Sequence, residues 1–148
     1  MLFHLIDRID HWEPKASVRG TKLTSLSETY WQDGPAGLHM PRSLVVEAVC
    51  QAATWLVMLS TQTTKRAALL SIGSVEWSGD VGPGAVMDLD ATVESMSEEM
   101  AVMSGTAAVD GRTIMTAADI MCVLIDAGDL EDVEDTDRMR LRLDRSGR

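Results

Sequence analysis

The strongest constraint on the fold of this chain is the stretch Met40–Ser60, MPRSLVVEAVCQAATWLVMLS, which is apolar or small at nearly every position. Pro41 suits the first turn of a helix, where its missing N–H costs nothing, and no Gly or Pro interrupts the stretch from Leu44 to Leu59. A helix that is apolar on almost all sides is buried inside a protein. The stretch is too short and too interrupted to span a bilayer, so it predicts a long helix in the core of a folded domain.

The polar exceptions in this predicted helix are Glu47, Gln51 and Thr54, which are spaced at i, i+4 and i+7. Residues at this spacing lie on one face, so they form a polar stripe along a buried helix. A carboxylate inside a core is costly unless it is paired or hydrogen-bonded, and a buried carboxyl is a candidate general acid. The stripe therefore predicts a functional site on the helix. The structural alternative is that Glu47 only anchors the preceding loop through backbone N–H groups.

The rest of the chain has the patterns of an antiparallel sheet. Residues 1–11 carry apolar side chains at helix-like spacing and predict a short leading element, and residues 27–38 form a turn-rich loop before the helix. Asp110-Gly111 is the strongest hairpin signal. Strand patterns cover residues 15–26, 67–77, 86–96, 100–109 and 113–125. The order predicts an α+β fold, and because a sheet of this size covers one side of the helix, a second subunit is expected on the other.

Length, charge and cysteine content restrict the cellular location and the classes of partner that we expect. The 148 residues suit one domain over residues 1–125, followed by a charged C-terminal tail, 126–148, for which a solvated segment is the usual interpretation. The net charge of −10 argues against nucleic acid and anionic membranes as partners. Cys50 and Cys122 lie in apolar runs and predict reduced core thiols, with no metal site. The N-terminus lacks the pattern of a signal peptide, which predicts a cytoplasmic protein.

Three segments resemble, in order, the FabZ-like 3-hydroxyacyl-ACP dehydratases, a group of hot-dog-fold enzymes of fatty acid synthesis. LIDRIDHWEPKASVRGTK looks like the family's opening "LLIDRI…W.PGK…G.K", and RAALLSIGSVEWSGDVGPGA resembles its "V.PGD" strand and turn. YWQDGPAGLHMPRSLVVEAVCQAA aligns with "FF.GHFPG.PVMPGVL..EA.AQAA". The resemblance covers roughly residues 1–125 and implies a hot-dog fold, in which an antiparallel sheet wraps one long buried central helix.

The resemblance also implies a site shared between the two protomers of a dimer, with no cofactor and no metal. In the family a His removes the C2 proton of a 3-hydroxyacyl thioester on acyl carrier protein or CoA, and an acid protonates the departing hydroxyl. Glu47 occupies the acid position and Gln51 the neighbouring Gln. Asp33 stands at the His position and Arg42 at the Gly after Met40-Pro41. The residues expected to line the substrate are Met40, Pro41, Arg42 and Gln51.

Three hypotheses for the activity follow. In a working dehydratase Asp33 acts as the base, or His39 takes its place, although Asp33 before Gly-Pro also suits a purely structural turn. A hot-dog acyl thioesterase would use Glu47, with His39 near the helix start. The third hypothesis is a non-catalytic acyl-thioester binder, or one subunit of a heterodimer whose catalytic paralogue supplies the His. A homodimer or a higher oligomer fits the first two.

Overall fold

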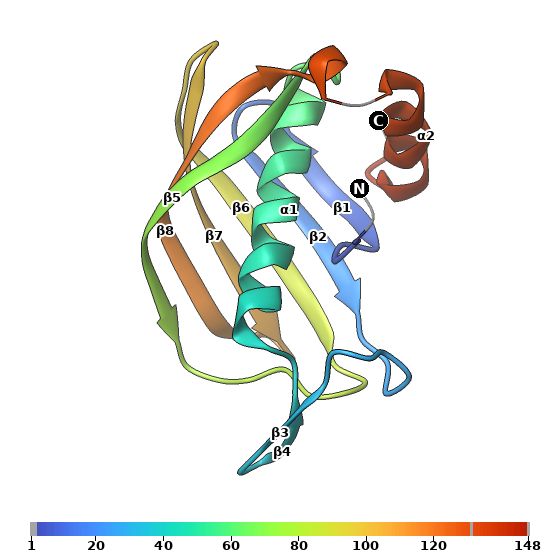
Figure 1. Ribbon diagram of the computed structural model, residues 1–148, viewed down its shortest axis with the longest axis vertical. Helices are drawn as coiled ribbons and strands as arrows, with labels where there is room; N and C mark the ends of the chain where they lie inside the picture. Colours follow the sequence, from blue (N-terminus) through green and yellow to red (C-terminus); the bar gives the residue numbers. More distant parts are fainter. Residues whose placement is uncertain (1–2, 131, 148) are drawn as a thin grey trace.

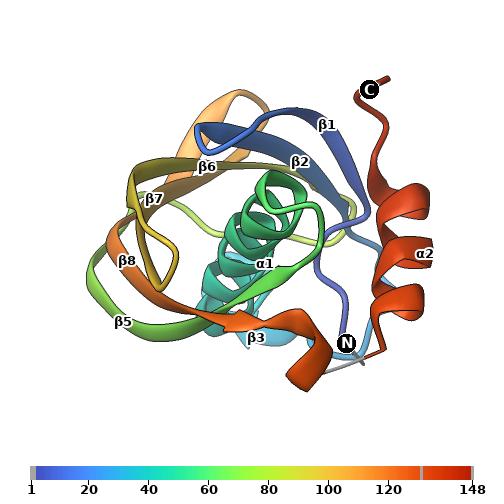
Figure 2. The same ribbon diagram turned by 90° about the horizontal axis from the view of Figure 1, so that it is seen from above.

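The computed structural model describes residues 3–130 and 132–147, and its main element is a six-stranded antiparallel sheet that curls around one long helix (Figures 1 and 2). The helix is α1 (Arg42–Ser60). The strand order is β1-β2-β6-β7-β8-β5. The bounds of these strands are β1 (Arg8–Glu13), β2 (Ser17–Leu23), β5 (Lys65–Trp77), β6 (Val86–Met96), β7 (Met100–Val109) and β8 (Arg112–Asp126). This is the predicted hot-dog arrangement of sheet and central helix.

Small residues let α1 approach the sheet closely. Ala48, Val49, Ala52 and Ala53 are almost completely buried. Opposite them, Gly105 of β7 leaves room for the helix, because a Cβ at this position would lie 2.4 Å from Cγ1 of Val49. Helix α1 is the one described helix long and apolar enough to cross a membrane, and it lies instead in the concave face of the sheet.

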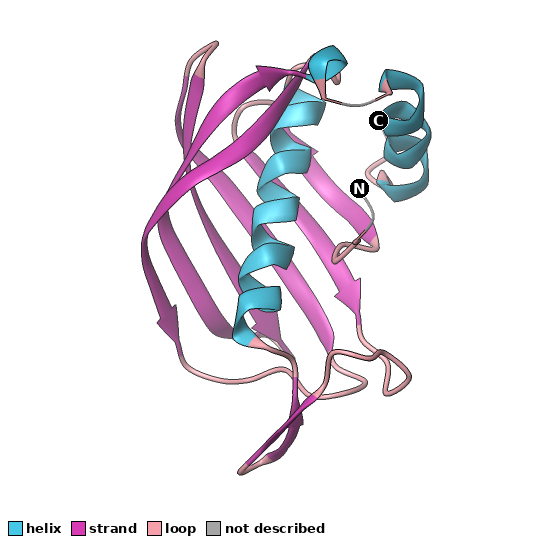
Figure 3. Cartoon of the chain, viewed as in Figure 1, coloured by secondary structure: helices cyan, strands magenta, loops and turns pink. Residues whose placement is uncertain are grey.

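The strand predictions are confirmed closely for β6, β7 and their turns. In β6, Met87, Leu89 and Ala91 face the core, while the alternate residues face outward. The β7–β8 hairpin turns at Asp110 (φ 52°) and Gly111 (φ 75°), the positive values that a two-residue turn of this kind requires. Figure 3 shows the long strands that result on either side of these turns.

The helix-like spacing in residues 1–11 does not form a helix. Residues 3–7 have no regular secondary structure, and the segment continues into β1, which pairs with β2. Leu5, Ile6 and Ile9 are all buried, because the segment runs along α1 before it joins the sheet and meets core on more than one side. Apolar residues therefore follow one another without the alternation of a half-exposed strand.

The charged C-terminal residues form helix α2 (Val133–Leu143), preceded by a short 3-10 turn, Ala127–Asp129, instead of a solvated tail. Acidic residues occupy the first turn of α2 and basic residues the last, which complements the helix dipole. The side chain of Asp132 caps the helix by accepting a hydrogen bond from the N–H of Glu134 at 2.9 Å.

The end of α2 is attached to β1. The N–H of Arg145 donates to the carbonyl of Ile9 at 2.8 Å, and Asp144 forms an isolated parallel bridge with Ile9. Trp12 donates its indole N–H to Asp144 at 3.3 Å. Helix α2 therefore lies along the β1 edge of the sheet, as Figure 2 shows.

Candidate functional site

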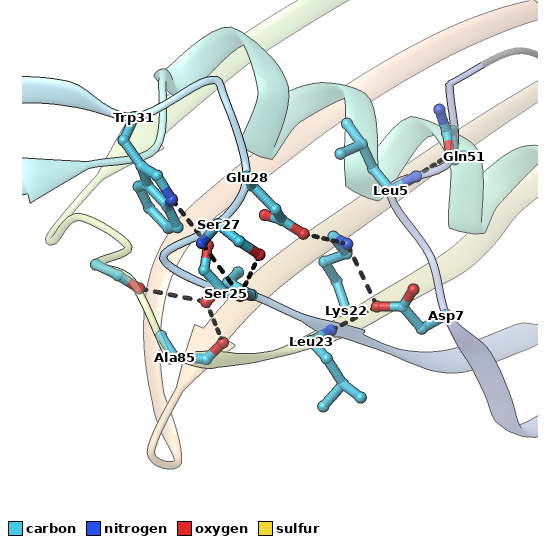
Figure 4. Close-up of polar contacts among 12 residues, drawn as sticks. Leu5, Asp7, Lys22, Leu23, Ser25, Ser27, Glu28, Trp31, Gln51 and Ala85 are labelled. Atoms are coloured by element: carbon cyan, nitrogen blue, oxygen red, sulfur yellow. Dashed lines mark hydrogen bonds and ion pairs between the residues drawn. The ribbon is translucent and has the colours of Figure 1, made fainter.

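The polar stripe predicted on α1 is present, and Gln51 organises it. Gln51 is 3% exposed and its amide makes three hydrogen bonds. Oε1 accepts from the backbone N–H of Leu5 at 2.9 Å, a contact drawn in Figure 4. Nε2 donates to the carbonyl of Phe3 and to Oε1 of Glu47, both at 2.9 Å.

These contacts fix the direction of the hydrogen bond between Gln51 and Glu47. A backbone N–H can only donate, so the Gln51 oxygen must face Leu5 and the NH₂ group must face Glu47. Oε1 of Glu47 is then an acceptor. A proton held by Glu47 resides on Oε2, which becomes the oxygen that can give or take a proton.

Glu47 is exposed in the single chain, which corrects the expectation of a buried carboxylate. The sheet covers one side of α1, as Figure 2 shows, whereas Glu47 is exposed and lines a cavity of about 220 Å³. Gln51, Thr54 and Cys50 of α1 line this cavity, opposite Arg66, Ala67 and Leu69 of β5. Covering the open side of α1 would bury Glu47.

Cys50 lies in the same cavity and is not a thiolate at neutral pH. Burial, followed by the charges of Glu47 and Cys122, raises the pKa of Cys50 to about 11. Both cysteines are free, as predicted. The thiolate is the nucleophilic form of cysteine, so Glu47 is the group in this cavity that is available for acid–base chemistry.

The turn-rich loop before α1 contains a hairpin that the sequence analysis did not predict. Strands β3 (Gln32–Gly34) and β4 (Gly37–His39) pair in register, with Asp33 opposite Leu38. Figure 1 shows the hairpin projecting beyond the first turn of α1, away from the sheet. Asp33 is exposed on it.

His39 lies at the base of this hairpin and is partly buried. Its ring packs over Gly34, where a Cβ would lie 2.7 Å from Cδ2, and its Nδ1 is 3.2 Å from the carbonyl oxygen of Met40. It lines a second cavity of about 420 Å³ formed by the hairpin, Asp80 and Gly82. Within the described residues no hydrogen bond joins Glu47 to Asp33 or His39, so a single chain does not bring the three predicted catalytic residues together.

The start of α1 holds the remaining predicted residues. Met40 is buried and its N–H donates to the carbonyl of Val81 at 2.8 Å. Pro41 is the N-cap, and no side chain among the described residues caps the first turn. The guanidinium of Arg42 lies 4.8 Å from the ring centroid of Trp77 and pairs with Asp80 at 3.3 Å. Arg42 is thereby held against the loop after β5.

A buried lysine supports the loop that leads to the hairpin. The side chain of Lys22 on β2 is 8% exposed. Its Nζ lies 3.4 Å from Asp7 and 3.2 Å from Glu28, as Figure 4 shows. In the same loop Trp31 donates its indole N–H to the carbonyl of Ser25 at 2.9 Å. No fixed spacing connects Lys22 to its two partners, so the sequence carries no signal for this cluster.

Three comparisons with known proteins agree with this architecture. Residues 1–118 match the FabA-like domain family. A 3-hydroxyacyl-[acyl-carrier-protein] dehydratase FabZ from Anaeromyxobacter sp. (strain K) is 31% identical over 129 residues, covering 84% of this chain and 82% of the relative.

The similar solved structures include the dehydratase heterocomplex ApeI:P from Xenorhabdus doucetiae, with a TM-score of 0.63 at 13% identity, covering 92% of this chain and 88% of that one. A hypothetical thioesterase with coenzyme A from Streptococcus pneumoniae TIGR4 has a TM-score of 0.61 at 14% identity, covering 80% of this chain and 85% of that one. At these identities the structural matches establish the hot-dog fold.

Proposed function

Because this chain belongs to the FabA-like family, we propose that it is a dehydratase that acts on 3-hydroxyacyl thioesters carried by acyl carrier protein or CoA. The observation that carries the proposal is the Glu47–Gln51 pair at the mouth of a cavity on α1. Gln51 bonds to Oε1 of the carboxyl group and leaves Oε2 available to a ligand. A cytoplasmic location belongs to the same proposal, since the one described helix of membrane-spanning length packs in the concave face of the sheet.

In the proposed reaction a base removes a proton from C2 of the substrate, the C2–C3 double bond forms, and the C3 hydroxyl leaves as water with a proton from Glu47. Oε2 of Glu47 is the atom that gives the proton. The backbone N–H groups of the uncapped first turn of α1 polarise the thioester carbonyl, because the helix dipole stabilises the negative charge that develops there. Pro41 and Met40 position this turn.

The base in this proposal is Asp33, with His39 as the alternative, and it comes from the hairpin of a second copy of the chain. Two observations support a dimer. The hairpin projects away from its own domain, and β5 is an edge strand of 13 residues that pairs with only β8 among the described strands. Leu69 and Leu70 on this edge are 51% and 58% exposed. A second β5 would cover them and place a partner beside the open side of α1.

A substitution at Glu47 tests the dehydratase. Purified protein is mixed with crotonyl and 3-hydroxyacyl thioesters, and the enoyl absorbance is followed. We expect Glu47→Gln to lower the rate by about 10²–10⁴-fold, as for loss of a general acid. Glu94→Gln is the matched control, because Glu94 is exposed on β6 and its carboxylate accepts a hydrogen bond from Ser104. Equal rates for the wild type and Glu47→Gln would rule out Glu47 as the acid.

The alternative function is thioester hydrolysis, and the accessibility of Glu47 favours it. A carboxylate that accepts a hydrogen bond from Gln51 and is open to solvent can act as a base toward water or as a nucleophile toward a thioester. The same assay detects it as release of free thiol without enoyl formation. Binding of acyl thioesters with neither product would identify a non-catalytic subunit, and a catalytic paralogue that restores dehydration would identify a heterodimer.

A further inference from the structure

The cavity at the base of the β3–β4 hairpin, called here the hairpin cavity, has a volume of about 420 Å³. Its walls are residues 34–39 of the hairpin together with Asp80 and Gly82 of the connection between β5 and β6. Figure 1 shows this connection passing beside the base of the hairpin. The hairpin cavity is therefore next to the first turn of α1, where the proposed function places the thioester carbonyl.

The outer edge of β4 has backbone groups that do not bond to β3. The two strands form a sheet of their own, joined by a two-residue turn between Gly34 and Gly37. The pair that closes such a turn is hydrogen-bonded, and the next pair is not, because the two kinds of pair alternate along an antiparallel ladder. The next pair is Asp33 and Leu38. The N–H and C=O of Leu38 therefore point away from β3.

Two contacts show that this edge of β4 faces the β5–β6 connection. The N–H of Met40, two residues after Leu38, donates to the carbonyl of Val81 at 2.8 Å. A Cβ placed on Gly82 would lie 3.7 Å from the carbonyl oxygen of Leu38. Among the described residues, no backbone hydrogen bond joins Leu38 to this connection. Leu38 thus presents one donor and one acceptor, side by side, at the hairpin cavity.

A strand edge with an open donor and acceptor is a template for a second extended amide chain. The pantetheine arm, which acyl carrier protein and CoA share, is such a chain, with two amides separated by two methylene groups. It is uncharged along this length. The carboxylate of the hairpin cavity is Asp80, which already pairs with Arg42 at 3.3 Å, so the cavity suits an uncharged ligand. Pro35 and Ala36 add apolar surface for the alkyl groups of the arm.

We propose that the outer edge of β4 binds the pantetheine arm of the acyl carrier, with the N–H and C=O of Leu38 bonded to one amide of the arm. The amide C=O accepts from the N–H of Leu38, and the amide N–H donates to its C=O. The acyl group then continues over the first turn of α1 toward Glu47, which lies about 8 Å along the helix axis from Arg42. The proposal rests on the proposed function for the position of the thioester.

An NMR titration with unreactive ligands tests the bond to the C=O of Leu38. The ligands are butyryl ketones in which a methylene group replaces the thioester sulfur, so the protein cannot consume them. One carries the full pantetheine arm, one keeps only the first amide as an N-acetyl group, and one has the matching acetate ester, which lacks the N–H. We expect the amide to bind about fivefold more tightly than the ester, and the full arm to bind at least as tightly as the amide. Equal dissociation constants for amide and ester, or no binding of any ligand, would overturn the proposal.

A proline variant tests the bond from the N–H of Leu38. Leu38→Pro removes this N–H and leaves the hydrogen bonds between β3 and β4, and should weaken binding of both short ligands about fivefold. Leu38→Ala is the matched control, because it removes the exposed side chain but keeps the N–H, and it should bind within about twofold of the wild type. Equal losses in the two variants would contradict a backbone contact. If Leu38→Pro does not fold, the comparison of amide and ester in the wild type still decides.

The same ketone attached to CoA or to acyl carrier protein distinguishes the two sources of the arm. The carrier that loses affinity in Leu38→Pro, and keeps it in Leu38→Ala, is the one that uses the edge of β4. If neither carrier loses affinity, the proposal is wrong. A Leu38→Pro variant that binds normally but changes its mass in ultracentrifugation would show that the edge pairs with another chain instead.

Binding and catalysis fail separately in this design. A preference for the amide without enoyl formation from 3-hydroxyacyl thioesters would retain the arm site and reject the dehydratase. Enoyl formation with equal affinities for amide and ester would retain the dehydratase and reject the arm site.

Discussion

Glu47 and Cys50 occupy the same cavity, yet the structure prepares only one of them for proton transfer. Gln51 orients the carboxyl of Glu47 through a single oxygen. The neighbouring thiol is kept neutral by burial and by the negative charge of Glu47, which raises the pKa of Cys50 to about 11. The two groups are thus coupled, and a change in the charge of Glu47 should be visible in the titration of Cys50.

This coupling gives a prediction for thiol reactivity. In a Cys122→Ser background, iodoacetamide should label Cys50 slowly at neutral pH, and the rate should rise as pH approaches about 11. Glu47→Gln removes the second-largest cause of the shift and should move this rise to lower pH. Mass spectrometry of the labelled protein follows the rate. An identical profile with Glu47→Gln would contradict the coupling, and Glu94→Gln is the control.

Residue spacing predicted part of the site and could not predict the rest. The i, i+4 separation correctly placed Glu47 beside Gln51, because one helix determines both positions. The exposure of Glu47 depends on where the sheet ends, which no local pattern encodes. The sequence gives no signal for Arg66 either, because Arg66 lines the cavity of Glu47 only after β5 has paired with β8.

At the scale of elements, the packing of α1 against β7 depends on a glycine, Gly105. A Cβ on Gly105 would lie 2.4 Å from Val49 and 3.0 Å from the carbonyl oxygen of Asp90. The second neighbour is backbone and cannot rotate away. Gly105 is therefore required for the position of the helix, and with it for the position of Glu47.

We expect Gly105→Ala to lower the free energy of unfolding by about 1–3 kcal/mol through overpacking. Val49→Ala in the same chain removes the closest side-chain contact and should recover part of this loss. Urea denaturation of the two single variants and the double variant measures the coupling. Strictly additive effects would show that the side chain of Val49 is not the obstacle.

The attachment of α2 to β1 should depend on pH through Asp144. Burial raises the pKa of Asp144, but hydrogen bonds from Ser146 and Trp12 and the charge of Arg140 outweigh it, so the pKa lies below its ordinary value. A carboxyl with a lowered pKa in the folded protein stabilises it above the ordinary value of about 3.9, and this contribution is lost as pH falls through the folded value.

The wild type should therefore exceed Asp144→Asn in stability at pH 7, and the difference should shrink as pH falls below about 4. Urea denaturation at a series of pH values provides the measurement, and protease cleavage between β8 and α2 reports local detachment. A difference that grows toward low pH would have the wrong sign for this interaction. The control variant is Asp129→Asn. Asp110→Asn is not suitable as a control, because Asp110 has a positive φ.

For the whole molecule, the proposed dimer follows from what one chain leaves uncovered. The sequence predicted the core well, because alternation in β6 and the apolar helix are local signals of burial. It did not predict β1 at residues 8–13, whose apolar residues pack against more than one neighbour. Local pattern therefore identified the layers of the fold, whereas the course of the two termini depended on tertiary contacts.

The dimer prediction concerns the exposed residues of β5. Analytical ultracentrifugation of the wild type should give the mass of two chains or a multiple of it, and Leu70→Lys should shift the population toward one chain. Leu26→Lys is the control, because Leu26 is 68% exposed but lies in the loop after β2. A wild type that sediments as a single chain would reject the proposal of a site shared between copies.

The position of α2 has a consequence for the stoichiometry of assembly. A sheet with two open edges can add strands at both ends and grow without limit. Here Asp144 and Arg145 bond to Ile9 at the β1 edge, whereas β5 pairs with only β8 among the described strands. In the proposed dimer, edge-to-edge growth would then end after a single pairing of β5 strands. Removal of α2 is expected to expose the β1 edge and to allow growth beyond two chains.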